Sequence, residues 1–495
     1  MKSKKNIEQK ILRGLDFFRD YSRCHLNVRK GEFQLITNNL LELAKVVREP
    51  LPREKKEFLN LWHPFRIEQR ATRKSKKKDI ETFDIYSAAN LVNIGILYWT
   101  FGEFKKAEES YSRALKICRQ LAKQDPDIFE PDLAETINYL GNLYRNLKEI
   151  KKAEKFYTEA LGIYRELAER DPDMFENVAG TLNNLGTIYS DLKEFEKAKK
   201  YYIKALGIRR ELAEKDPDAF NPFLAITLNN LGSLYRDLRE FKEAEEHSSE
   251  ALKVFRELAE KEPEVFEPYL AMTLNNFGNL YSDLRKFKKA EESYTEALKI
   301  YRELTEKYPD DFDFYMAETF NNLGGLNYDL RRFGKAENYY SKAKAIFNKL
   351  AERDPDTSRF GLAITLNNIG SLYRDLGEFE IAEKSYTEAL KIYRELGEKE
   401  PKVFDPYIAI TLNNIGNLYS DLNKLREAKK SYTEAVNIYG ELVKKDPDTF
   451  DPYFRQTYSN LQETYSNLEN LLGKTEELYR TKVSETLKKS SEKPD

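Results

Sequence analysis

A glycine recurs at an almost constant interval along most of this chain. It stands at Gly95, Gly141, Gly186, Gly232, Gly278, Gly324, Gly370 and Gly416, with successive steps of 46, 45, 46, 46, 46, 46 and 46 residues. Self-similarity at such a period is typical of repeat proteins, in which each unit buries one face against the next. The 495 residues are therefore predicted to form an array of eight units, not one large core.

Each unit has the pattern of two α-helices. Leucines around the glycine, as in TLNNLGSLYRDL at 227–238, follow the spacing of one helical face. Alanines stand twelve and nineteen residues after the glycine, as at Ala290 and Ala297, with an aromatic residue between them in seven units and Ser248 in the fourth. A proline stands thirty-one residues after each glycine, where it ends the second helix or follows its end. The expected fold is all-α, a solenoid of eight helical hairpins over residues 81–456.

The glycine itself costs roughly 1 kcal/mol of helix stability relative to alanine. Its presence in all eight units indicates a packing role, in which another backbone approaches closely and the alanines of the facing helix supply a complementary shape.

The two ends depart from the repeat. Residues 1–80 carry 21 Lys+Arg against 10 Asp+Glu, whereas the remainder carries 61 against 74. Amphipathic stretches at 6–18 and 33–47 predict helices, so this basic region is expected to cap the first hairpin. Residues 457–480 keep the phase of a ninth unit, but Gln462 replaces the glycine and the alanines are lost. They are expected to form a degenerate capping repeat, followed by a disordered tail at 481–495.

The leucine, glycine, tyrosine and alanine pattern resembles the tetratricopeptide repeat over residues 81–456. The usual unit of that family has 34 residues, whereas this one has 46, and the longer hairpins look most like the kinesin light chain style of repeat. The resemblance implies a superhelix whose first helices line a concave groove that meets the ligand.

One polar stripe of the first helices, opposite the leucines, is the candidate binding site. Neutral amides dominate it where lysine or glutamate would serve solubility better. An amide row can bond to the backbone of an extended peptide, at about 1 kcal/mol for each hydrogen bond. Arginines within it favour carboxylate or phosphate groups on a partner. The candidate residues are Asn138, Asn183, Asn229, Asn275, Asn321, Asn367, Asn413, Arg145, Arg236, Arg374, Ser190, Ser282 and Ser420.

An alternative reading is that these asparagines only bond to neighbouring helices and hold the repeats together. That structural role is expected for the second asparagine of each pair, as in Asn184 and Asn230, which lies nearer the edge of the stripe. The aspartates that end the first helices, such as Asp237 and Asp283, are expected to bond across the turn to the start of the second helix.

These features predict a non-enzymatic scaffold that binds an extended peptide or a helix of a protein partner, which the arginines would allow to be acidic. The alternative is a nucleic-acid-associated adaptor acting through the basic region 1–80, in which the run RATRKSKKK at 70–78 is a candidate contact. An enzyme ranks last, because no nucleophile, base or metal set is visible, and no cofactor or metal is expected. Charges interrupt every apolar run and only two cysteines occur, so a cytoplasmic protein outside the membrane is expected.

Overall fold

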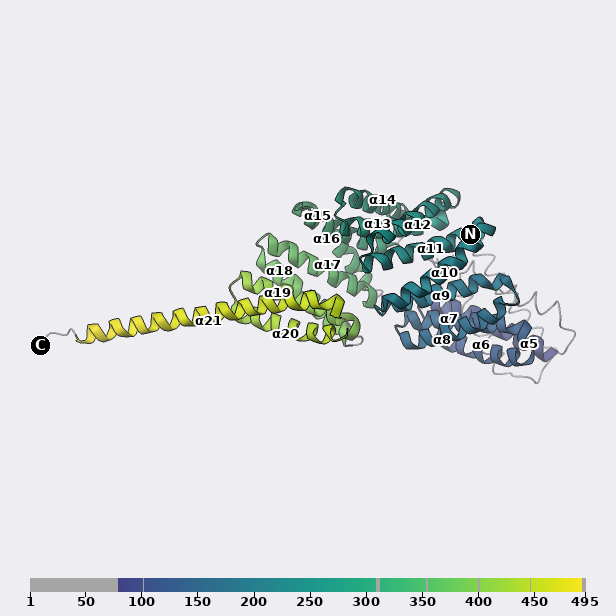
Figure 1. Cartoon of the computed structure of the whole chain (residues 1–495), viewed down its shortest axis with the longest axis horizontal. Coiled ribbons are helices and arrows are strands. Elements are labelled where there is room, and N and C mark those ends of the chain that lie inside the picture. Colours follow the sequence, from purple (N-terminus) through teal and green to yellow (C-terminus); the bar gives the residue numbers. More distant parts are fainter. Residues whose placement is uncertain are drawn as a thin grey trace. The chain divides into compact units, whose positions relative to one another are not determined.

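The computed structural model describes residues 79–491, apart from residues 101, 309–311, 353–354, 399–400 and 446. The predicted cap at 1–80 therefore lies almost wholly outside the described residues. The chain divides into two compact units, residues 1–311 and residues 312–495, which we describe separately (Figure 1).

All of the described elements are helices, as the repeat pattern predicted. The N-terminal unit contains α5 Asp79–Thr100, α6 Phe104–Gln124, α7 Pro126–Asn146, α8 Ile150–Ala168, the short 3₁₀ helix η1 Pro172–Met174, α9 Phe175–Asp191, α10 Phe195–Lys215, α11 Pro217–Asp237, α12 Phe241–Lys261, α13 Pro263–Asp283 and α14 Phe287–Lys307. The C-terminal unit contains α15 Asp313–Asp329, α16 Phe333–Ala351, α17 Pro355–Asp375, α18 Phe379–Gly397, α19 Pro401–Asp421, α20 Leu425–Val443 and α21 Pro447–Ser491. Within each unit, neighbouring helices pair into antiparallel hairpins that stack on one another.

Local sequence signals set the ends of these helices. Prolines open α7, α11, α13, α17 and α19 at the first helical position, where a missing N–H costs nothing. Within a hairpin, the first helix ends in a left-handed residue seven positions after the glycine. At Lys193 the φ angle is 62°, and the next amide, Glu194 N, donates to Tyr189 O at 2.8 Å. This is the hydrogen-bond pattern of a Schellman motif, which satisfies the last carbonyls of a helix.

The recurring glycine makes room for a tyrosine ring, which corrects the expectation of a close backbone. A Cβ atom added at Gly141 would lie 2.6 Å from Cδ1 of Tyr157, and the same clash recurs at Gly278 with Tyr294. Each of these tyrosines comes from the second helix of the same hairpin. Tyr157 donates its hydroxyl to Asn142 Oδ1 at 2.6 Å, so the ring is held at both ends. The alanines on either side of the ring are fully buried, as expected.

The third repeat breaks the core pattern at Arg209. Six other repeats have an aromatic residue at this position, twenty-three after the glycine, whereas Arg209 is 4% exposed. Its Nη2 lies 2.7 Å from Glu176 Oε1 of α9, and its Nη1 donates to Thr227 Oγ1 of α11 at 2.7 Å. Burial raises the pKa of Glu176, and the charge of Arg209 opposes that rise. A buried ion pair here takes the place of the aromatic side chain that six other repeats have at this position.

The last helix is longer than the sequence predicted. Residues 457–480 belong to one continuous helix, α21, which runs from Pro447 to Ser491 (Figure 1). Its first half closes the C-terminal unit: Leu461 is 6% exposed and packs with Ala428 and Tyr432 of α20. The helix also includes residues 481–491, which the sequence assigned to a disordered tail, while residues 492–495 lie outside the described residues.

Candidate peptide-binding stripe

The asparagines of the first helices form a ladder between consecutive repeats. In the N-terminal unit, Asn230 Nδ2 on α11 donates to Asn183 Oδ1 on α9 at 3.2 Å, and Asn276 Nδ2 on α13 donates to Asn229 Oδ1 on α11 at 3.3 Å. The second asparagine of each pair thus bonds to the preceding repeat, as the sequence indicated.

The C-terminal unit repeats this arrangement. Asn368 donates to Asn321 at 3.2 Å, Asn414 to Asn367 at 3.3 Å, and Asn460 to Asn413 at 3.3 Å. Asn460 belongs to α21, so the ladder continues onto the degenerate ninth unit.

The second repeat departs from the ladder. Asn184 Nδ2 reaches Asn142 Oδ1 at 3.4 Å instead of the first asparagine, Asn138. Asn138 Oδ1 is buried without a hydrogen-bond partner among the described residues. Asn275 lies half-buried on α13, the last first helix of its unit.

The ladder changes what the first asparagine can offer to a ligand. Its Oδ1 accepts a hydrogen bond from the next repeat. This is the alternative that the sequence left open, in which the asparagines hold neighbouring repeats together. Within the described part of the chain, Nδ2 of Asn183 and Asn229 makes no hydrogen bond, and neither atom is sealed from solvent. The residues are nevertheless only 8% and 4% exposed. Asn183 and Asn229 therefore each keep one amide donor that no neighbouring residue uses, in a nearly buried position.

Several aspartates at the ends of the first helices pair with the preceding repeat, contrary to the expectation of a bond across their own turn, whereas Asp237 pairs with Arg236 beside it at 3.0 Å. Arg374 Nε lies 2.6 Å from Asp421 Oδ2, and Arg236 Nε lies 3.6 Å from Asp283 Oδ2. Burial raises the pKa of Asp191, and the positive charge of Arg145 in the preceding repeat opposes that rise. All three candidate arginines thus have a carboxylate of the following repeat nearby.

The sixth repeat uses a tyrosine for the same contact. Tyr328 donates its hydroxyl to Asp375 Oδ2 at 2.9 Å, and Arg331 Nη1 lies 2.9 Å from the same oxygen. The three candidate serines, Ser190, Ser282 and Ser420, are half-buried near the ends of their helices. Backbone carbonyls of Ser282 and Ser420 accept from the left-handed turn residues that follow.

An apolar row lies beside the amide row, and the sequence analysis did not identify it. Six residues before the glycine stand Ile226 and Met272 in the N-terminal unit, and Ile364 and Ile410 in the C-terminal unit, all half-buried. These positions share a face with the first asparagine, three residues later on the helix. The signal was the 46-residue recurrence of an apolar residue on an otherwise polar side.

Glu318 interrupts the apolar row. It occupies the same position in the sixth repeat, where burial alone raises its pKa to about 7. A carboxyl group with this pKa changes charge close to neutral pH.

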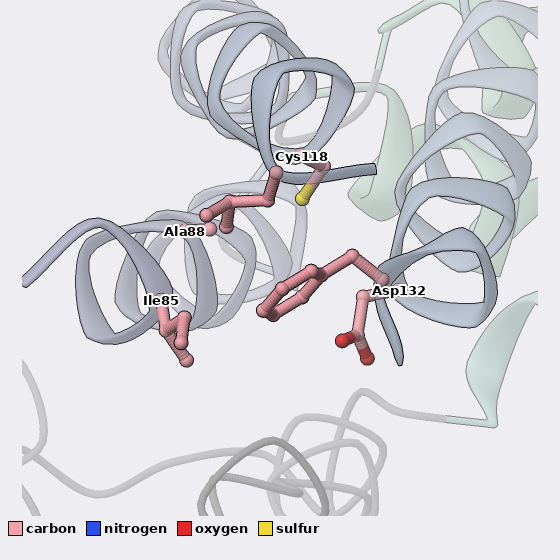
Figure 2. A pocket seen from close by; sticks show the side chains of 6 residues that line it. Ile85, Ala88, Cys118 and Asp132 are labelled. Carbon is pink, nitrogen blue, oxygen red and sulfur yellow. The ribbon is translucent and has the colours of Figure 1, made fainter. Parts of the chain in front are cut away.

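A small cavity near the N-terminal end does not form a second site. It lies between α5, α6 and α7 and is lined by Ile85, Ala88, Cys118 and Asp132, among others (Figure 2). Its volume of about 10 Å³ holds roughly one water molecule. Cys118 stands where most repeats have an aromatic ring, so the smaller side chain leaves this space; it is buried, as expected for a core residue, and burial raises its pKa to about 12.

In the part of the chain that the structure describes, no group of three or more His, Cys, Asp or Glu side chains could hold a metal ion. No helix there is both long enough and apolar enough to cross a membrane.

Several solved structures are similar to this chain. Aspartyl phosphate phosphatase F from Bacillus subtilis matches at 16% identity with a TM-score of 0.50, covering 78% of this chain and 93% of that one. BtubC (BKLC) from P. vanneervenii matches at 30% identity with a TM-score of 0.41, covering 50% of this chain and 92% of that one. The pilF protein of Pseudomonas aeruginosa matches at 17% identity with a TM-score of 0.34, covering 59% and 99%. No curated protein sequence matches significantly.

Family comparison assigns the repeat directly. Models described as tetratricopeptide repeat match residues 88–121, 133–173, 177–257, 223–303, 315–395 and 361–441. These matches cover more than half of the 495 residues and coincide with the helical hairpins. The chain therefore belongs to the tetratricopeptide repeat family.

Proposed function

We propose that this protein is an interaction scaffold that binds an extended segment of a partner protein along the amide stripe of its first helices. The observation that carries the proposal is the asparagine ladder. The inter-repeat hydrogen bonds to Asn183, Asn229, Asn321 and Asn367 use Oδ1 of the first asparagine and leave its Nδ2 as a donor. Family membership supports a protein-binding role, because stacked repeats generate long surfaces suited to extended ligands.

An extended peptide fits these donors chemically. Its backbone carbonyls are acceptors, and its side chains alternate between two directions. One direction meets the apolar row of Ile226 and Met272, and the other meets the arginine–aspartate pairs. A row of donors is needed, since each hydrogen bond contributes only about 1 kcal/mol.

The arginine–aspartate pairs also bear on the kind of partner. Arg236 and Arg374 each lie close to an aspartate of the next repeat, so their charges are largely offset. An acidic partner, expected from the arginines alone, thereby loses its main support. We infer instead a partner segment with apolar side chains and no strong net charge.

The test replaces donors without disturbing acceptors. Peptides selected from a random peptide library on the wild-type protein are titrated against a variant in which Asn183, Asn229, Asn367 and Asn413 are all changed to Asp. Aspartate keeps the oxygen that accepts from the next repeat but removes the NH₂ group. We expect at least about a tenfold weaker affinity, since several hydrogen bonds of about 1 kcal/mol are lost.

The matched control breaks the ladder instead. Changing Asn230, Asn276, Asn414 and Asn460 to Ala removes the inter-repeat donors but keeps the four first asparagines. This control should lower the melting temperature and retain peptide binding. If the aspartate variant binds the peptides as tightly as wild type, the stripe is not the binding surface.

The nucleic-acid alternative rests on the excess of basic residues at 1–80, which lies almost wholly outside the described residues. It remains a prediction with a direct test. Charge-neutral replacement of the five lysines and arginines at 73–78 should abolish any salt-dependent binding of RNA or DNA. Absence of such binding by the wild-type chain at low salt would dismiss it.

A further inference from the structure

The sixth repeat lacks a side chain that most repeats carry on the face of the first asparagine. One residue after the glycine, five repeats have a side chain that accepts a hydrogen bond from the tyrosine of the second helix, at 2.6 to 3.0 Å. The pairs are Tyr157 with Asn142, Tyr202 with Thr187, Tyr294 with Asn279, Tyr386 with Ser371 and Tyr432 with Asn417. The sixth repeat has Gly325 here, so its tyrosine, Tyr340, lacks this acceptor.

Gly325 leaves open space beside the hydroxyl group of Tyr340. A Cβ atom added at Gly325 would have only Tyr340 Oη within 4 Å, at 3.7 Å. The tyrosine itself is 2% exposed. Among the residues that the structure describes, its hydroxyl group makes no hydrogen bond, yet the oxygen is not sealed from solvent. A ligand that enters this space therefore meets an unused hydroxyl group.

Glu318 lies on the same face of α15, seven residues before Gly325, which is about two helical turns or about 10 Å. The side chain is half-buried, and it makes no hydrogen bond or ion pair with any described residue. Burial raises the pKa of its carboxyl group, and no cation of the described chain offsets the rise. A carboxylate in such a place is costly until a positive charge arrives beside it.

We propose that the sixth repeat receives a lysine or arginine side chain of the partner segment, an inference that rests on the proposed peptide-binding function. The partner backbone crosses α15 between Asn321 and Gly325, where the missing side chain lets it approach closely and where Tyr340 donates to one of its carbonyl groups. The side chain that meets the apolar row in other repeats meets Glu318 here.

Charge complementarity favours a basic side chain over the alternatives. Elsewhere in the C-terminal unit, the carboxylates at the ends of the first helices already face a cation: Asp375 pairs with Arg331, and Asp421 pairs with Arg374. Glu318 has no such partner in the described part of that unit. An acidic or apolar side chain would leave its carboxylate unpaired, whereas a single basic residue would pair with it and still leave the partner segment without strong net charge.

The first test compares charges on both sides of the contact, at pH 8, where Glu318 is mostly ionised because its pKa is about 7. Peptides selected from a random library on the wild-type protein should share a lysine or arginine at one position. Replacing it with norleucine, which keeps an alkyl chain but no charge, should weaken binding at least about tenfold. Glu318→Gln should weaken binding of the parent peptide by the same factor and leave binding of the norleucine peptide unchanged.

Two further variants make this test specific. Glu380→Gln removes the same charge from an exposed site in the first turn of α18, so it should bind the parent peptide as wild type does. Glu318→Lys should prefer a peptide with glutamate in place of the basic residue. Full affinity of Glu318→Gln for the parent peptide would overturn the proposal.

Gly325→Ser separates a binding role from a structural one. It restores the residue type of Ser371, fills the space and gives Tyr340 an acceptor. Since serine is also the better helix former, the melting temperature should rise while peptide affinity falls by about fivefold or more. Unchanged affinity would show that the backbone does not pass over this residue and would overturn that part of the proposal.

Failure of this inference is distinguishable from failure of the proposed function. If the variant with four asparagines changed to aspartate loses affinity while Glu318→Gln and Gly325→Ser do not, the basic-residue site is wrong and the amide stripe stands. If the wild-type protein selects no peptide, both proposals are overturned.

Discussion

At Gly141 an added methyl carbon would lie 2.6 Å from the ring of Tyr157, whereas at Gly162 on the next helix it would meet nothing within 4 Å. The two glycines thus separate packing from helix propensity. Gly162→Ala should stabilise the protein by up to about 1 kcal/mol, since alanine is the better helix former. Gly141→Ala should destabilise it by about 1–3 kcal/mol, because the overpacked ring must move. Urea unfolding of both variants measures the difference, and equal effects would contradict a ring-packing role.

Glu318 makes the folding stability of the C-terminal unit depend on pH. Its pKa in the folded protein is about 7, above the ordinary value of 4.5, so the folded state binds the proton more tightly than the unfolded state. The stability that this implies is fully present below about pH 4.5 and is lost as the pH rises through 7. Glu318→Ile, which restores the residue type of Ile364, should therefore raise stability at pH 8 by about 1–3 kcal/mol.

The Glu318 prediction is checked by urea unfolding at pH 5 and pH 8. The gain from Glu318→Ile should be much smaller at pH 5, where the carboxyl group is mostly neutral in the folded state. Glu318→Gln should reduce the pH dependence in the same way while adding no apolar contact. A gain that is equal at both pH values would rule out titration of Glu318 as the cause.

At the scale of whole elements, the side chain of Arg209 links three helices to one another. It belongs to α10 and bonds to Glu176 of α9 and Thr227 of α11. Removing one member of a buried ion pair leaves the other charge uncompensated, so Glu176→Ala should cost about 3–5 kcal/mol. Adding Arg209→Phe, the residue type of Phe255, should recover most of this loss.

The double variant gives the Arg209 prediction its control. If the pair is a polar substitute for the aromatic side chain of other repeats, unfolding in urea should give similar free energies for wild type and the Glu176→Ala, Arg209→Phe protein. Arg209→Phe alone should be nearly as harmful as Glu176→Ala, because Glu176 is then buried without its partner. Additive effects of the two changes would argue against a coupled pair.

The helices themselves could be predicted from the sequence because the repeat period agrees with the residues that begin and end each helix. The glycine spacing, the alanines and the prolines each point to the same hairpin, and the structure confirms it. Helix α21 could not be predicted in the same way. With Gln462 in place of the glycine and no alanines after it, no local signal ends the helix. Its contact with α20 continues through Tyr465, which lies under Lys429 Nζ at 4.3 Å from the ring centre.

At the scale of the molecule, the stripe was predictable as a set of residues but its bonding was not. A helical wheel places Asn229 on a face, yet it cannot show that Asn276 of the next repeat reaches back to it. The same limit applies to Asp283 and Asp421, whose partners lie forty-seven residues away in the chain. Contacts between repeats depend on the stacking geometry, which no single unit encodes.

The asparagine ladder also makes the units interchangeable. From Asn183 to Asn276, and again from Asn321 to Asn460, each repeat donates to the one before it through the same two atoms, so adjacent copies within these stretches are compatible. Duplication or loss of a whole copy within either stretch would leave its ladder bonds intact, and the array could lengthen or shorten there over evolution without new contacts between repeats. Contacts of this kind do not specify which repeat follows which. One position in the series differs from another only through exceptional residues such as Arg209, which bonds within its own repeat and to the next.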